Sequence, residues 1–182
     1  MRMRITTRGT VYLAFFIALG VILTRFASIR LTVMGIESIR IGMSGFPLIF
    51  AGLLFGPVAG GIVGALTDII GFFMSPMGGY MPHFTLTAAL TGILPALFLK
   101  VSRRSEKAGF PALLLAILAG EIITALVLVP YFQHLLFGFP YRLIIPPRIV
   151  TVALEAPLYA GIAHSLLHRL EALVRRLRLS YR

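Results

Sequence analysis

The sequence predicts an all-α membrane protein, a bundle of six transmembrane helices with both termini in the cytoplasm. Of the 182 residues, 58% are hydrophobic and only 13% are charged, and the mean hydropathy is +0.95. A chain of this composition cannot keep its apolar surface away from water as a soluble domain. The apolar residues also fall into long runs, separated by short stretches rich in Gly, Pro or basic residues, which is typical of membrane-spanning helices.

Six apolar stretches are expected to cross the bilayer within one integral membrane domain that occupies residues 1–182. A helical span needs about 20 residues, and short loops leave room for six in this chain. Gly56 followed by Pro57 predicts a turn between the second and third spans, because this pair breaks a helix. The expected spans are residues 10–28, 45–56, 58–73, 84–100, 111–132 and 147–170.

The net charge of +11 follows this expected topology. With the N-terminus inside, twelve of the seventeen Lys and Arg residues fall on the cytoplasmic side. The positive-inside rule explains such a distribution, so the charge indicates a multi-pass orientation in the lipid bilayer and not nucleic-acid binding. The five exceptions are expected at the outer ends of spans or in outer loops: Arg25, Arg30, Arg40, Arg142 and Arg148.

Some of these outer residues are candidates for binding an anionic ligand. A guanidinium group donates paired hydrogen bonds to a carboxylate, and Arg25, Arg40 and Arg148 adjoin apolar helix. In a neighbouring outer loop, Tyr80 and His83 offer an aromatic surface and a polar edge to a bound ring. The alternative for the arginines is that they extend to lipid headgroups or pair with an acidic residue at the same surface.

Three acidic residues lie within predicted spans, where each needs a protein or water partner: Asp68, Glu121 and Glu155. None of them has a second acid at helical spacing, which weakens a metal or proton-relay interpretation. Glu155 follows Arg148 by two helical turns and is a candidate to orient it or a ligand amine. Glu121 is expected to hydrogen-bond either to a heterocycle or to a neighbouring helix.

No catalytic motif is present, so the chain is not expected to be an enzyme. It has no phosphate-binding G-x-x-x-x-G-K-[ST] loop, no G-x-S-x-G elbow and no cysteine. We expect no cofactor and no metal, and we interpret His164 and His168 as a pair at the membrane interface. Energy for uphill transport would then come from an ion gradient or from a separate ATPase subunit.

Small residues at helical spacing predict close helix packing at two places. Ala14 and Ala18 form a pair in the first span that lets another helix approach, and they are a candidate partner surface. Gly60 and Gly64 are expected to pack the third span against its neighbours inside the bundle.

Four stretches of the chain carry a family resemblance. Residues 37–71 contain RIGMSGFP, AGLLFGP and GIVGALTD, and residues 78–93 are GGYMPHFTLTAALTGI. The other two are PPRIV at residues 146–150 and the pair Ala14 and Ala18. Together they resemble the substrate-binding S components of energy-coupling factor (ECF) vitamin transporters, and within them the folate-specific FolT group.

The resemblance implies a six-helix S component in the cell membrane, whose outer loops and helix ends enclose one small-molecule vitamin. It also implies an EcfT-type transmembrane coupling protein and two cytoplasmic ECF ATPases as partners. In that family the S component is thought to tip over in the membrane to release its ligand inward. Ala14 and Ala18 would then form the face that lies against the coupling protein.

Folate is the ligand that the resemblance implies. Tyr80, Phe84 and Phe46 would stack on its pterin and aromatic rings, while outer arginines would pair with its glutamate carboxylates. The chain departs from the FolT pattern at several positions, including His83 where that group has Gly. Another vitamin or precursor, such as pantothenate or a pyrimidine, therefore remains an alternative ligand, and a membrane scaffold without transport activity remains an alternative function.

Overall fold

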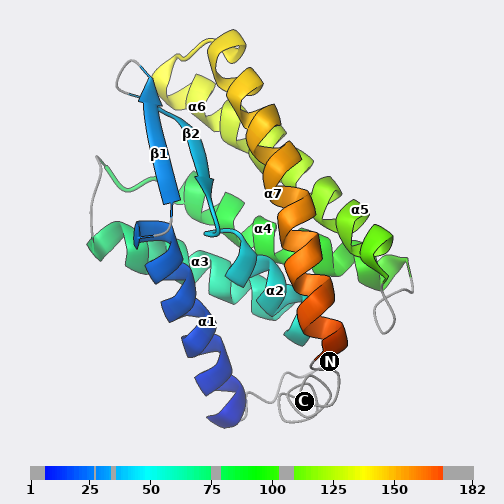
Figure 1. Ribbon diagram of the computed structural model, residues 1–182. Helices are drawn as coiled ribbons and strands as arrows, with labels where there is room; N and C mark the ends of the chain where they lie inside the picture. Colours follow the sequence, from blue (N-terminus) through cyan, green and yellow to red (C-terminus); the bar gives the residue numbers. More distant parts are fainter. Residues whose placement is uncertain (1–6, 27, 34–35, 75–78, 103–108, 170–182) are drawn as a thin grey trace.

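The computed structural model describes residues 7–26, 28–33, 36–74, 79–102 and 109–169. All six predicted stretches contain helices, which confirms the fold class, and one two-stranded hairpin is added to them (Figure 1). The segments α5, η1 and α6 form one helix from Phe110 to Phe137, within which η1 is a π-helix. The elements in order are α1 (Thr7–Phe26), β1 (Ser28–Val33), β2 (Ile36–Gly42), α2 (Phe46–Phe55), α3 (Pro57–Met74), α4 (Pro82–Val101), α5 (Phe110–Glu121), η1 (Ile122–Leu128), α6 (Val129–Phe137) and α7 (Tyr141–Arg169).

The length and surface of the helices identify a multi-pass membrane protein. Large apolar side chains are exposed on their outer faces, and Phe73 and Val101 are more than 70% exposed. Lipid accommodates such a surface, whereas water does not. α1 and α2 contribute shorter apolar stretches, Gly9–Thr24 and Phe46–Phe55. The helices long and apolar enough to cross a bilayer are Pro57–Met74, Pro82–Val101, Phe110–Phe137 and Tyr141–Arg169.

The predicted turn after the second helical stretch is confirmed. α2 ends at Phe55, and Gly56 adopts a φ of 100°, a left-handed conformation that glycine reaches without steric cost. Pro57 then begins α3, a position where its missing N–H leaves no helical hydrogen bond unmade.

Glycines bring α3 and α4 into contact through their backbones. A Cβ atom on Gly60 would collide with the carbonyl oxygen of Gly92, and one on Gly64 would collide with that of Ala88. The two helices can approach this closely only because side chains are absent there. The expectation that Gly60 and Gly64 serve internal packing is thus confirmed.

The hairpin of β1 and β2 is the element that the sequence analysis did not predict. Its strands are antiparallel, with Ser28 opposite Gly42 and an irregular register between Leu31 and Thr32. β1 alternates polar residues with Ile, Leu or Val, and β2 does so except at the adjacent Glu37 and Ser38. The hairpin stands beside α7, at the end of the molecule remote from Thr7 (Figure 1).

Two helices extend beyond the predicted spans. The fifth stretch continues to Phe137, and α7 begins at Tyr141 although its span was expected from residue 147. Pro146 and Pro147 therefore lie inside α7 instead of opening it. The hydrogen bonds they cannot donate would go to the carbonyls of residues 142 and 143, which are exposed at the helix end, so the helix tolerates their loss.

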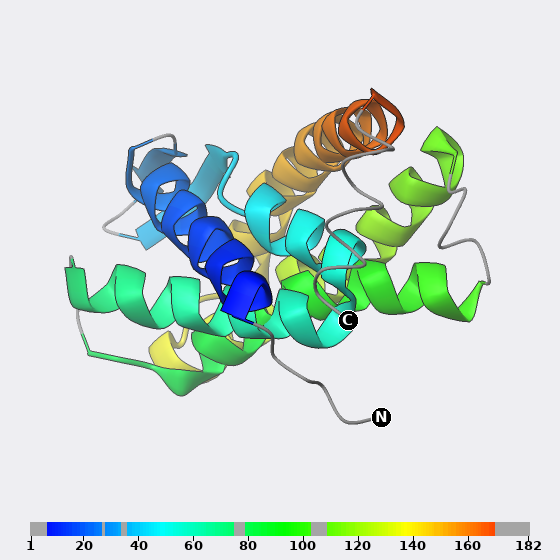
Figure 2. The same ribbon diagram turned by 90° about the horizontal axis from the view of Figure 1, so that it is seen from below.

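The core is one cluster of buried side chains from α1, α2, α3, α4, α5 and α7. Ile49, Leu113, Ile117 and Tyr159 are almost completely buried there. α1, the hairpin and α7 lie on one side of a layer formed by α3 and α4 (Figure 2). This arrangement places the end of β2 next to the middle of α7, which positions the candidate site.

Candidate functional site

The end of β2 is attached to α7 through both backbone groups of Gly42. Its N–H donates to Oε1 of Glu155 at 2.9 Å, and its carbonyl oxygen accepts a hydrogen bond from the Tyr159 hydroxyl at 2.6 Å. Glu155 and Tyr159 are four residues apart and so share one face of α7. Gly45 lies against the buried Tyr159 ring. A Cβ atom built on Gly45 would lie 3.3 Å from the edge of that ring. The chain after the hairpin is therefore held at mid-height of α7.

A second carboxyl group lies beside this attachment. Glu121 is the last residue of α5, is 5% exposed, and is near enough to Glu155 for their charges to interact. Its Oε2 accepts no hydrogen bond from any described residue. Glu121 is eleven residues into the helix that begins at Phe110, about 16 Å along its axis at 1.5 Å per residue. The pair therefore lies near the middle of the bundle's depth.

A hydrogen-bonded network joins α3 to the start of α4. The Thr85 hydroxyl donates to Oδ2 of Asp68 at 2.7 Å, and it lies 2.9 Å from the Tyr80 hydroxyl. The Tyr80 ring stacks on Phe73 with a centroid distance of 6.2 Å and meets Phe72 edge-on at 5.3 Å. Asp68 thus has the protein partner that its place in a span requires, and Tyr80 is held by its ring and its hydroxyl.

Residues of α6 contact two of the predicted site residues. The His83 ring lies 4.9 Å from that of Phe132, and Nη2 of Arg148 donates to Oε1 of Gln133 at 3.2 Å. α4 contacts both η1 and α6, and α7 contacts β2, η1 and α6. His83 and Arg148 therefore contact adjacent residues of α6, while Glu155 contacts the end of β2 and Tyr80 the end of α3.

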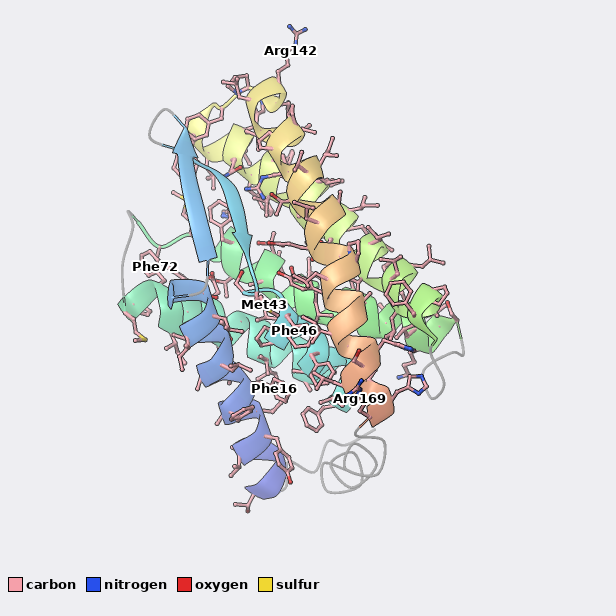
Figure 3. The ribbon with its side chains drawn as sticks, in the orientation of Figure 1. Phe16, Met43, Phe46, Phe72, Arg142 and Arg169 are labelled. Atoms are coloured by element: carbon pink, nitrogen blue, oxygen red, sulfur yellow. The ribbon has the colours of Figure 1, made fainter. Side chains whose placement is uncertain are left out.

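The remaining predicted ligand residues are placed differently. Phe46 is 7% exposed and packs in the core, 5.2 Å from the Phe50 ring and 6.0 Å from that of Tyr159. Figure 3 shows it between α1 and α7, near Met43. Phe84 is half-buried near the start of α4. The side chains of Arg25 and Arg40 lie outside the described residues.

The predicted partner surface lies on the outside of α1. Ala14 and Ala18 are both exposed, one turn apart on the helix. Their side chains leave the backbone accessible to a second helix. Their role in contacting a partner stays a prediction.

The half of the molecule opposite the hairpin carries a small apolar hollow between α4 and α5. Its volume of about 160 Å³ is below the range of about 300–1,000 Å³ that small-molecule sites occupy. The hollow therefore does not suit a vitamin. It is lined by Phe98, Leu99, Ser102, Ala112, Leu115, Ala116 and Ala119.

The two histidines at the end of α7 contact each other. The His164 and His168 rings are 4.4 Å apart, and Phe110 lies 6.2 Å from His164. Among residues 7–26, 28–33, 36–74, 79–102 and 109–169, no group of three His, Cys, Asp or Glu side chains is placed to hold a metal ion. The contact fits an aromatic pair at a helix end.

Sequence reasoning missed Gly42, Tyr159 and Gln133 as parts of this region. Tyr159 had one usable signal, because it follows the intramembrane Glu155 by four residues. Gly42 had none, since its partners on α7 are more than a hundred residues away along the chain. Glu121 was recognised as an acid within a span, but only the structure shows that it is buried within electrostatic range of Glu155.

Comparisons with known proteins agree on one type of protein. A family model described as ECF-type riboflavin transporter, S component, matches residues 4–172. The folate transporter FolT of Clostridium novyi (strain NT) is 31% identical over 150 residues, which are 82% of each chain. The crystal structure of FolT bound with folic acid superposes with a TM-score of 0.75 at 24% identity, over 91% of this chain and 97% of that one. The S component for biotin from an ECF-type ABC transporter superposes with a TM-score of 0.65 at 20% identity, over 98% of this chain and all of the other.

Proposed function

The chain belongs to the S components of ECF-type transporters, and we propose that it captures folate on the outer side of the membrane and delivers it inward. The observation that carries the choice of folate is the 31% identity to a folate transporter over 82% of both chains. The family model that spans residues 4–172 is described by riboflavin instead, so the ligand has to be argued from the residues as well.

The charges near the hairpin favour folate over riboflavin. Folate carries the carboxylates of its glutamate, whereas riboflavin has no ionised group at neutral pH. Arg148 projects from α7 toward α6, and Arg142 is exposed at the same end of the helix (Figure 3). A guanidinium group pairs with a carboxylate through two parallel hydrogen bonds. The neutral ribityl chain of riboflavin has no carboxylate and cannot form this charged pair.

The aromatic residues suit a flat ring system. Tyr80 is 40% exposed, and its hydroxyl is held by Thr85. The exposed part of its ring can therefore contact a ligand without a further loss of side-chain conformational entropy. His83 is exposed next to Phe132 on the neighbouring helix. Stacking of an aromatic ring of folate on such rings adds about 0.5–1.5 kcal/mol beyond the area that it buries. Phe46 would contribute indirectly, because it packs under the segment that follows the hairpin.

We propose that the hairpin faces the outside and that both termini lie in the cytoplasm. Lys100 and Arg169 are exposed at the helix ends away from the hairpin, and the positive-inside rule assigns such ends to the cytoplasm. Arg142 and Arg169 mark the two opposite ends of α7 (Figure 3). A cysteine introduced at each end and labelled from one side of a sealed vesicle tests this orientation.

We further propose that transport requires an EcfT-type coupling protein and two cytoplasmic ATPases. The chain carries no nucleotide-binding loop of its own, so ATP hydrolysis has to be supplied by other subunits. The exposed Ala14 and Ala18 offer the coupling protein a face on α1 where two helix backbones can come close.

Equilibrium binding to the purified chain in detergent tests the proposed ligand. Titrations with folate, riboflavin, pantothenate and a pyrimidine such as thymine separate the alternatives. We expect one folate per chain, with an affinity at least about 100-fold above that for the other three. Tighter binding of another of these compounds would assign the S component to that ligand. If the protein binds none of these compounds while a cooperative thermal unfolding transition shows that it is folded, the result would favour a scaffold.

A further inference from the structure

Glu121 is a buried acid whose hydrogen bonding is incomplete within the described chain. It is 5% exposed, and its Oε2 has no donor. Leaving a carboxylate oxygen unpaired in a buried site is costly, and it is more costly inside a membrane, where water is scarce. Such an oxygen calls for a donor that the described residues do not supply.

The neighbouring donors are already committed to other acceptors. The single hydroxyl proton of Tyr159 goes to the carbonyl of Gly42, and the N–H of Gly42 goes to Glu155. One turn beyond Glu121, the Thr124 hydroxyl donates to the carbonyl of Gly120 at 3.0 Å. These hydroxyl and amide donors therefore go to acceptors other than Oε2 of Glu121.

The local helix geometry is a second, independent feature of this place. The helix changes from α to π directly after Glu121, at Ile122, and returns to α at Val129. A π-segment costs helical hydrogen-bond geometry, and such segments occur frequently at functional sites. The change of geometry therefore coincides with the incompletely paired carboxyl group.

The cluster also lies where a ligand from the outer side would end. It is at mid-depth, next to the point where the end of β2 meets α7. His83 at the start of α4 contacts Phe132, about 16 Å along the helix from Glu121, while Gly120 beside Glu121 packs against Pro95 in the middle of α4. A long ligand held by Arg148 near the outer end of α7 would extend its other end toward this level.

We propose that Glu121 receives a ring edge of the ligand that carries two adjacent N–H donors. This inference rests on the proposed function, and it names the part of folate that the site selects: the 2-amino group and N3–H of the pterin. In its ionised form, which two N–H donors at this place would favour, the Glu121 carboxylate accepts two parallel hydrogen bonds from such an edge through its two oxygens. In a flavin the corresponding N3–H is flanked by two carbonyl groups. Their oxygen atoms would face the oxygen atoms of the Glu121 carboxylate, and neither side could donate a hydrogen bond there.

The experiment compares folate with its 2-oxo analogue, in which a carbonyl replaces the 2-amino group, on the wild-type chain and on Glu121→Gln. Wild type should bind folate at least about 30-fold more tightly than the analogue, the size expected for a hydrogen bond to a charged group. Glu121→Gln should lose at least about 30-fold in folate affinity and much less in affinity for the analogue, so that the preference shrinks. A purely structural role for Glu121 would lower both affinities equally.

Thr124→Val is the matched control, because it removes a buried polar group one turn away on the same helix. Its folate affinity should stay within about threefold of wild type. Equal binding of folate and the analogue by wild type overturns the inference even if Glu121→Gln does not fold. A wild-type chain that binds no folate overturns the proposed function itself, which is a different result from binding folate without this preference.

Discussion

Replacing Gly92 by alanine tests whether the backbone contact of α3 and α4 holds the fold together. A Cβ atom on Gly92 would collide with the carbonyl group of Gly60 and lie 3.0 Å from its Cα. These are backbone atoms, which cannot rotate away, so the helices have to separate. Overpacking of this kind costs about 1–3 kcal/mol, and we take the upper end because no side chain can yield. The gain in helix propensity from Gly to Ala, about 1 kcal/mol, leaves a net loss of about 2 kcal/mol.

Gly161→Ala is the control for this substitution. Gly161 is inside α7, and a Cβ atom there meets nothing within 4 Å. It should leave stability unchanged or raise it by up to about 1 kcal/mol. Thermal unfolding in mild detergent should show Gly92→Ala melting about 4–8 °C below wild type, by the usual relation for chains of this size. The explanation fails if both variants melt at the same temperature.

Gly92→Ala should also weaken ligand binding. α3 and α4 carry Asp68 and Thr85, which form a network with Tyr80 just before α4. Its hydrogen bonds are 2.7 and 2.9 Å long and do not survive a shift of the helices by about 1 Å unchanged. Folate titration below the melting temperature measures this effect. Unchanged affinity with lowered stability would separate the network from the ligand site.

Three further predictions concern the site and its partners. Tyr159→Phe keeps the buried ring but removes the 2.6 Å hydrogen bond to the carbonyl of Gly42. The free energy of unfolding should fall by about 1 kcal/mol, and the amide hydrogens of the hairpin should exchange faster with solvent. Equal exchange rates in the variant and the wild type would contradict the attachment of the hairpin to α7. Ala14→Leu or Ala18→Leu should leave folate binding intact and abolish uptake in cells that contain the coupling protein and ATPases, because bulk on the exposed face of α1 blocks a close helix contact; parallel loss of binding and uptake would speak against a partner surface. Arg148→Ala should weaken binding of folate more than binding of a pterin without glutamate, and an unchanged ratio of the two affinities would exclude pairing with the carboxylates.

Helices could be predicted here because their signals are local. Each apolar stretch of about 20 residues predicts a span by its own length, and Gly56 with Pro57 predicts the turn by the conformations of two adjacent residues. Packing of Gly60 and Gly64 was also predictable, since small residues four apart form a groove on one helix whatever lies opposite.

The hairpin shows where local signals were insufficient. Residues 28–33 alternate polar and apolar side chains, and residues 36–42 do so only in part. Short segments of this kind between strongly apolar helices are also typical of an outer loop. The start of α7 was also misplaced, because prolines usually open a helix and here they lie within it. The exception costs little free energy, because the carbonyl groups left without a helical partner are exposed at the end of the helix.

The composition and order of the residues alone determined that this is a helical membrane protein, which way its helices are expected to face, and which family it resembles. Only the tertiary structure decided that Gly42 is bound by Glu155 and Tyr159, residues 113 and 117 positions further along, and that Glu121 is buried within electrostatic range of both. Spans follow from the transfer of each segment into lipid, which depends on that segment by itself. Contacts between helices and a strand far apart in the chain depend on how all the elements pack together, and no single segment carries that information.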